Sequence, residues 1–225
     1  MILIMKKFAS LLFTLSLVLF STQSCNVASG LAGLSPAKAL SGVQALLGGA
    51  STNALKGFAG NVLQNEVMKQ VLPPGLSNIT SLLGNSSEGT KALGLLNGAL
   101  ASAVPDVATS LLGDATKGIA AADALNLLKG GETGATDFLK NAAGKNLAAA
   151  LLPAMTKKLT DNGGLGAITS ALGGKAASLL GNGKPNLANL ATTGAVDGLF
   201  ALMGNAEKAE RANPTDPLLK EIFGK

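Results

Sequence analysis

Apolar residues recur every three or four positions along most of this chain, and glycine or proline interrupts the pattern at short intervals. This is the period of one face of an α-helix, whereas a half-buried strand alternates apolar and polar residues. Leu and Ala, which favour helices, are the dominant hydrophobes, and aromatic residues make up only 3 % of the chain. We therefore expect an all-α fold: an irregular multi-helix bundle of roughly 8–10 short helices in a single domain.

Glycine and proline set the expected ends of these helices. The Ser-Pro pair at 35–36 is typical of a helix start, and Gly48-Gly49 of a helix end. Because proline lacks the amide hydrogen that a helix interior needs, the helix that begins at Ser87 is expected to stop before Pro105. The other expected helices span 51–72, 77–83, 106–117, 121–129, 133–143, 145–160 with a kink at Pro153, 165–172, 175–180, 193–212 and 216–223.

Several glycines fall inside expected helices, where each costs about 1 kcal/mol relative to alanine. They are Gly57, Gly60, Gly94 and Gly98. We expect them to permit close approach between neighbouring helices. The spacing of Gly94 and Gly98 also matches the GxxxG motif of membrane helix pairs, but the polar residues around it favour packing between helices of a soluble domain.

Residues 1–24 have the pattern of a secretory signal peptide of the lipoprotein type. Lys6-Lys7 forms the positive segment, and the apolar run Phe8–Phe20 follows it. This run is shorter than the roughly 20 residues that a membrane-spanning helix needs. Met5 gives a more usual start to such a signal than Met1, so the initiator is one of these two residues.

The single cysteine, Cys25, directly follows this leader. A small residue before a cysteine, just past an apolar run, resembles the lipobox of bacterial lipoproteins, which implies that Cys25 is diacylated and becomes the mature N-terminus. The alternatives are ordinary secretion, with cleavage at the same bond, and a buried structural cysteine. Acylation removes a free thiol from an oxidising compartment. Residues 25–34 then form a short tether, and residues 35–225 form the helical domain.

The chemistry that most enzymes and nucleic-acid binders need is sparse here. The formal charge is +5, but the lysines are scattered, and Trp and Tyr are absent, which disfavours nucleic-acid binding. No histidine is present for a catalytic pair or a metal site, and an acylated Cys25 is neither a nucleophile nor a zinc ligand. We therefore expect no catalytic, metal-binding or cofactor-binding residues and no enzymatic activity.

The remaining polar candidates are carboxylates and one arginine, Arg211. Glu207 stands four residues before it, which is the favourable order for an ion pair on a helix. A bidentate anion site at Arg211 is the alternative. Acid pairs such as Asp123 and Asp137 could do acid–base work, but solvated surface charge is the simpler interpretation.

Three stretches of the chain resemble motifs of the bacterial family known as domain of unknown function 4197. They are ADALNLLKGGETGATDFLK at 122–140, GAVDGLFALMGNAEKAERANP at 194–214 and TDPLLKEIFGK at 215–225. The resemblance implies an exported, mostly helical, single-domain protein and supplies no activity. It offers Asp197, Glu207 and Arg211 as candidates for a structural polar cluster.

Together these features predict a membrane-tethered bacterial envelope lipoprotein that acts as a structural or interaction protein. Its expected partners are the membrane, through the N-terminal acyl chains, and an envelope protein or a second copy of the chain. By the lipoprotein resemblance, Asn26 implies the outer membrane, with the domain on the periplasmic face; a soluble periplasmic protein is the alternative. The alternative function is a carrier or binder of lipid-like apolar ligands, since a glycine-rich bundle can hold an apolar cavity.

Overall fold

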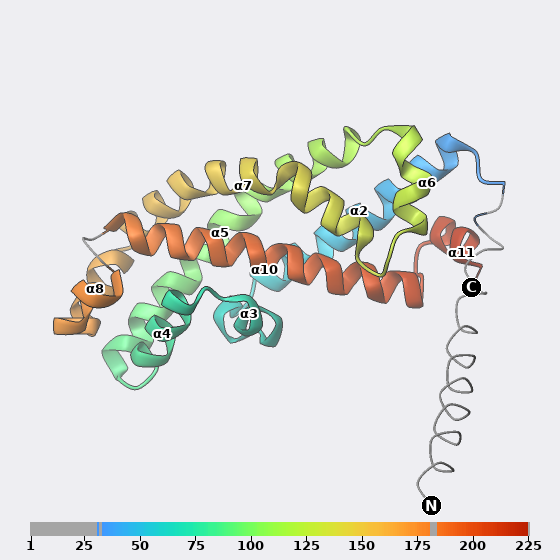
Figure 1. Ribbon diagram of the computed structural model, residues 1–225. Helices are drawn as coiled ribbons and strands as arrows, with labels where there is room; N and C mark the ends of the chain where they lie inside the picture. The colour runs from blue at the N-terminus through green and yellow to red at the C-terminus, as the bar shows by residue number, and fades with distance from the viewer. Residues whose placement is uncertain (1–30, 32, 181–183, 225) are drawn as a thin grey trace, which may run out of the picture.

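Four long helices run lengthwise through the molecule and form an elongated bundle (Figure 1). They are α2 (Pro36–Phe58), α5 (Ser87–Lys117), α7 (Gly134–Asp161) and α10 (Lys184–Ala212). The computed structural model describes residues 31, 33–180 and 184–224, and no strand occurs among these residues. The expected all-α, single-domain fold is confirmed. The predicted signal peptide and Cys25 lie outside the described residues.

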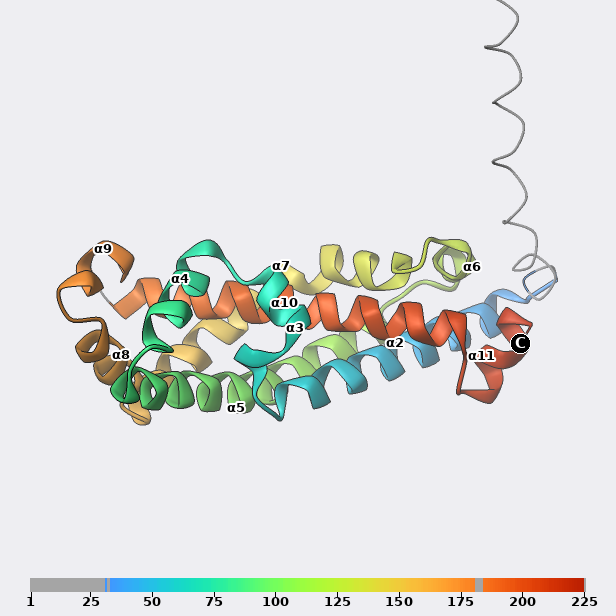
Figure 2. The same ribbon diagram turned by 90° about the horizontal axis from the view of Figure 1, so that it is seen from below.

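Short helices cover the two ends and one side of this bundle, as the two perpendicular views show (Figures 1 and 2). At the end where the described chain begins lie α6 (Ala121–Lys129) and α11 (Pro217–Phe223). In the opposite half lie α4 (Pro74–Leu83), α8 (Gly164–Leu172) and α9 (Ala176–Leu180). Helix α3 (Glu66–Val71) packs on α10, and two 3-10 turns span Val62–Gln64 and Gly173–Lys175.

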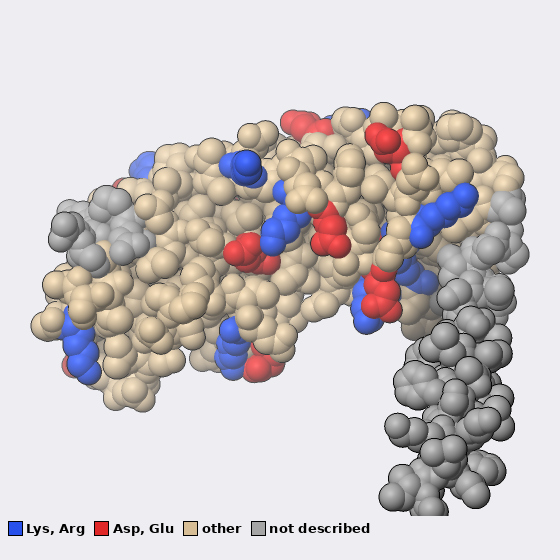
Figure 3. Space-filling model, in the orientation of Figure 1, with Lys and Arg blue, Asp and Glu red and all other residues tan. Residues whose placement is uncertain are grey.

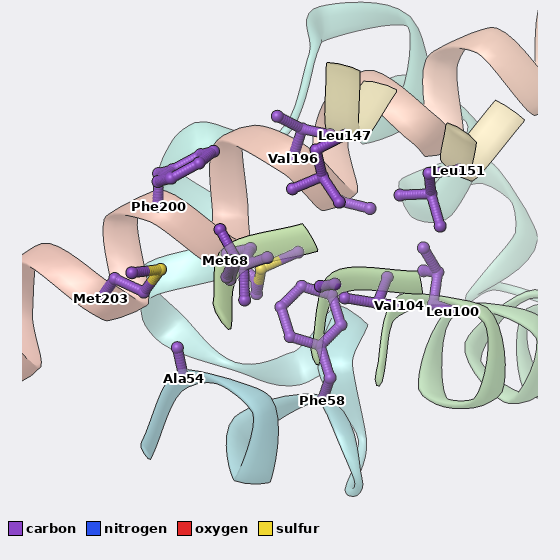
Figure 4. Packing of buried hydrophobic residues seen from close by; sticks show 14 of the residues in the cluster. Ala54, Phe58, Met68, Leu100, Val104, Leu147, Leu151, Val196, Phe200 and Met203 are labelled. Atoms are coloured by element: carbon purple, nitrogen blue, oxygen red, sulfur yellow. The ribbon is translucent and has the colours of Figure 1, made fainter. Parts of the chain in front are cut away.

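The core lies where α2, α5, α7 and α10 face one another, and α3 adds one side chain to it. In Figure 4, Phe58 of α2, Met68 of α3, Val104 of α5 and Leu147 of α7 point toward one another. All four side chains are fully buried. Leu31 is also buried and belongs to the same cluster, so part of the predicted tether packs against the domain.

The interior prolines do not end their helices, which corrects the expected boundary at Pro105. Helix α5 continues through Pro105, and α7 through Pro153, so the segments at 133–143 and 145–160 form one helix. The reason is packing on both sides of the proline. On α5 the fully or almost fully buried residues Leu100, Val104, Ala108 and Leu112 form one continuous stripe. Burying this stripe offsets the roughly 3 kcal/mol that an interior proline costs.

The Gly48-Gly49 boundary is also wrong. Helix α2 continues to Phe58, because Gly48 and Gly49 lie on its exposed face. The neighbouring residues Leu46, Leu47 and Ala50 remain buried. The expected helix at 51–72 is divided in turn: its first part completes α2, and its last part is α3, which Asn65 caps. The expected helix start at Thr193 is wrong as well, because α10 begins at Lys184, inside the stretch expected as a loop.

The expected close approach at helix glycines occurs at some positions and not at others. A Cβ atom added to Gly94 or Gly98 would meet nothing within 4 Å, so no neighbouring helix approaches there. At Gly57 the expectation holds, since a Cβ would lie 3.1 Å from Leu202. Close approach also occurs at Gly89, where a Cβ would overlap the backbone of Leu83.

Two helices are long and apolar enough to cross a membrane by length and composition alone. They are α5 and the part of α10 that spans Leu187–Ala212. In their most apolar windows, 39 % and 67 % of the residues are buried inside the bundle. Core helices meet the same criterion, so this finding carries little weight for a membrane span.

Two alanine substitutions in α5 test this assignment of the glycines. We expect Gly98→Ala to raise the free energy of unfolding by about 0.5–1 kcal/mol, because the site is open and alanine favours the helix. Gly89→Ala should lower it, because the added methyl group meets backbone atoms that cannot rotate away. Urea unfolding followed by circular dichroism measures both variants. A destabilised Gly98→Ala variant would contradict the model of an open face.

Candidate functional site

Glu207 is the one charged residue that is fully buried in the described chain. It accepts hydrogen bonds from the backbone amides of Ala135 and Thr136, at 3.1 and 2.7 Å. These amides belong to the first turn of α7, where helix geometry leaves donors without partners. The N-cap residue of that helix, Thr133, makes no capping bond with its side chain. Glu207 therefore caps α7 from a distant part of the chain.

Arg211 completes the same arrangement. Its Nε donates to Oε1 of Glu207 at 2.8 Å, and its side chain is 11 % exposed. Its Nη1 and Nη2 donate to the carbonyl oxygens of Leu128 and Leu127, at 2.7 and 2.8 Å. Both carbonyls lie in the last turn of α6, where acceptors lack helical partners. The guanidinium also lies over the ring of Phe223, 5.5 Å from its centroid.

We call Glu207 and Arg211 the capping clamp. Through backbone hydrogen bonds it joins the end of α6 to the start of α7, and through Phe223 it contacts α11. The three stretches that carry the family resemblance, 122–140, 194–214 and 215–225, therefore meet at this clamp.

Asp197, the third candidate, lies apart from the clamp. Its carboxylate accepts from Lys140 at 2.9 Å, and the two side chains are 38 % and 45 % exposed. The structure thus brings Glu207 and Arg211 together and places Asp197 in a separate surface ion pair between α10 and α7.

A shallow groove of about 430 Å³ surrounds that ion pair, between α3, α10 and the start of α7. Asp137 also lines it, and its carboxylate accepts a hydrogen bond from the hydroxyl of Thr133 at 2.9 Å. The charged groups of the groove are therefore engaged with neighbours. On the face shown in Figure 3, red and blue side chains mostly lie next to one another and form no large patch of one sign.

The acid pair Asp123 and Asp137 is not brought into contact by any interaction in the described residues. Asp123 is exposed in the first turn of α6. Among the residues that the structure describes, no group of three or more acidic or cysteine side chains could hold a metal ion.

A larger hollow, about 840 Å³, is an open groove between α3, α4 and the first half of α5. Polar side chains predominate in its lining: Asn61, Gln64, Lys69, Ser77, Thr80, Ser81, Thr90 and Asn97. Several of them bond to nearby backbone; Thr80 and Ser81, for example, both donate to the carbonyl of Ser77 at 2.9 Å.

Glu210 forms a second cap, at the turn that leads into α11. Its carboxylate accepts from the backbone amides of Thr215 and Asp216, at 2.6 and 3.0 Å. Burial opposes ionisation of Glu210, but these amides and the Thr215 hydroxyl outweigh it and hold the pKa of the carboxyl below its usual value.

The i,i+4 spacing of Glu207 and Arg211 was a sufficient signal for their contact. It held no information on the backbone partners at 127–128 and 135–136, which the sequence analysis missed. The turn at 130–134 gave no signal for these partners, because Thr133 is itself a residue type that commonly caps a helix.

A model of the family described as "Protein of unknown function (DUF4197)" matches residues 33–224. No curated protein and no solved structure matches the chain.

Substitutions at Glu207 and Asp197 separate the clamp from an ordinary ion pair. We expect Glu207→Gln to lower the free energy of unfolding by about 3–5 kcal/mol, because it leaves the Arg211 charge buried without its counter-charge. Asp197→Asn removes a carboxylate that is largely solvated, so it should change the free energy of unfolding by less than about 1 kcal/mol. Urea unfolding of both variants gives the comparison. Equal losses would contradict the role of the clamp.

The lowered pKa of Glu210 predicts a pH-dependent contribution to stability. Because ionised Glu210 is favoured in the folded state, its contribution is present above the ordinary glutamate pKa and is lost as the pH falls through the lowered one. The Glu210→Gln variant should therefore have a lower melting temperature than the wild type at pH 7. This difference in melting temperature should shrink at about pH 3. Thermal unfolding at the two pH values tests this. A difference that grows at low pH would refute it.

Proposed function

The chain belongs to the DUF4197 family of proteins of unknown function, and from that premise we propose that it is a bacterial envelope lipoprotein whose helical domain works by binding rather than by catalysis. Cys25 carries the acyl chains, and the domain is tethered to the outer membrane on its periplasmic face. Its partner is another envelope protein or a second copy of the chain. Two acyl chains are enough for stable anchoring.

The capping clamp is the observation that carries the non-catalytic part of this proposal. The carboxylate and the guanidinium that the sequence offers as candidates direct their hydrogen bonds to each other and to backbone atoms of α6 and α7. A group engaged in this way holds the fold together and has no free position for a substrate. The polar residues of the family motifs thus support an architectural role.

The surface supports binding through helix faces. On α5 the outward positions include the small residues Gly94, Gly98 and Ser102. A Cβ atom built on either glycine would meet no atom of a neighbouring helix within 4 Å. Small residues allow a partner helix to approach closely. The alternative, a carrier of lipid-like ligands, fits less well, because the groove of about 840 Å³ is open to solvent and does not enclose a ligand.

Metabolic labelling with a fatty acid, followed by membrane fractionation, tests the tether. We expect the wild type to incorporate the label and to sediment with outer membranes, and Cys25→Ala to do neither. Asp197→Asn is the matched control and should behave as the wild type, because it changes only a surface ion pair. An unlabelled protein with a free thiol in the soluble periplasmic fraction would exclude the tether.

The binding role has its own test. Sedimentation of the purified domain and crosslinking in cells should show either a defined oligomer or one recurrent partner, and both should change when Gly98 is replaced by a large residue. Co-purified lipid in native mass spectra, with a strictly monomeric domain, would favour the carrier function instead.

A further inference from the structure

The point at which the chain enters the bundle limits how the domain can sit on a membrane. Leu31 is 4 % exposed and packs in the core, and Ser35 caps α2 a few residues later. The step from Cys25 to Leu31 is six peptide units, which span at most about 20 Å. If Cys25 is acylated, as the proposed function holds, Leu31 lies within that distance of the lipid surface, and α2 begins five residues later.

The start of α2 lies at one end of the bundle, together with the helices that close that end. Helix α11 packs on α2, and Lys38 of α2 pairs with Glu221 of α11. Figures 1 and 2 both place α11 and the start of α2 at the same end, and α8 at the other. The long helices between the two ends are extended: the 29 residues of α10 rise about 44 Å.

The sides of the bundle offer little that would hold it flat on a membrane. A helix that lies in the lipid interface turns a stripe of large apolar side chains outward. Among the described residues, Leu82 is the one exposed large hydrophobic side chain, at 36 %, and it lies on α4, away from the attached end. The outward positions of α5 between Leu93 and Pro105 are small or polar instead.

We propose that the domain stands on its α2–α11 end, with this end facing the lipid surface and the α4–α8 end directed away from it. This inference rests on the proposed lipid tether and adds the orientation of the domain relative to the membrane.

Site-specific quenching measures this direction, because Cys25 is the only native cysteine and an introduced thiol is the only free one once Cys25 is acylated. Lys220→Cys places a fluorophore on α11, and Ser170→Cys places one on α8; both positions are exposed. The full-length acylated protein is reconstituted into vesicles of phosphatidylethanolamine and phosphatidylglycerol that contain a phospholipid with a nitroxide headgroup. Quenching at Lys220→Cys should exceed that at Ser170→Cys several-fold. A long Gly-Ser insertion after Cys25 should weaken it.

Two failures are distinguishable by the mass of the N-terminal peptide. With the acyl chains present, equal quenching at the two sites, or stronger quenching on α8, overturns the proposed direction and leaves the tether intact. An unacylated N-terminus with no vesicle association overturns the tether and the direction together.

Discussion

One buried carboxylate–guanidinium pair on α10 holds together the end of α6 and the start of α7, which lie some 70–85 residues earlier in the sequence. Removing a carboxylate from water costs several kcal/mol, so Glu207 is tolerated inside the domain only because Arg211 and two backbone amides replace its hydration. Those amides lie at the positive end of the α7 dipole, and the carbonyls that Arg211 binds lie at the negative end of α6. Each charge of the pair therefore meets the helix end of opposite sign, and the short turn between the two helices needs no cap of its own.

The helical class and the single domain followed from the period of Leu and Ala, since that period determines which residues can share a face. The helix ends were predicted less well because Gly and Pro are local signals. At Pro105 and at Gly48-Gly49, the apolar stripe continues unbroken across the signal, and its burial outweighs the local cost. At Asn65 no such stripe continues, and the polar side chain caps a new helix.

The candidate site divides in the same way. An i,i+4 spacing on one helix is local information, and it correctly indicated that Glu207 and Arg211 touch. Asp197 precedes Glu207 by ten residues, which is about 15 Å along a helix, so the two could share a site only through a bend that α10 lacks. The backbone partners on α6 and α7 are some 70–85 residues away, and nothing in the spacing of side chains encodes which amides remain unpaired after folding.

The α2–α11 end of the bundle, which we propose faces the membrane, also carries several long-range polar contacts. A load applied through a tether at Leu31 passes first into α2, which packs along α10, α6 and α11. At α11 the fit to α2 is close, since a Cβ at Gly42 would overlap Ile222. From α10 the clamp passes the load to α6 and α7 through charge-assisted hydrogen bonds, which are about twice as strong as neutral ones. The proposed tether would therefore pull on an end of the bundle whose helices are joined by close packing and by charge-assisted hydrogen bonds.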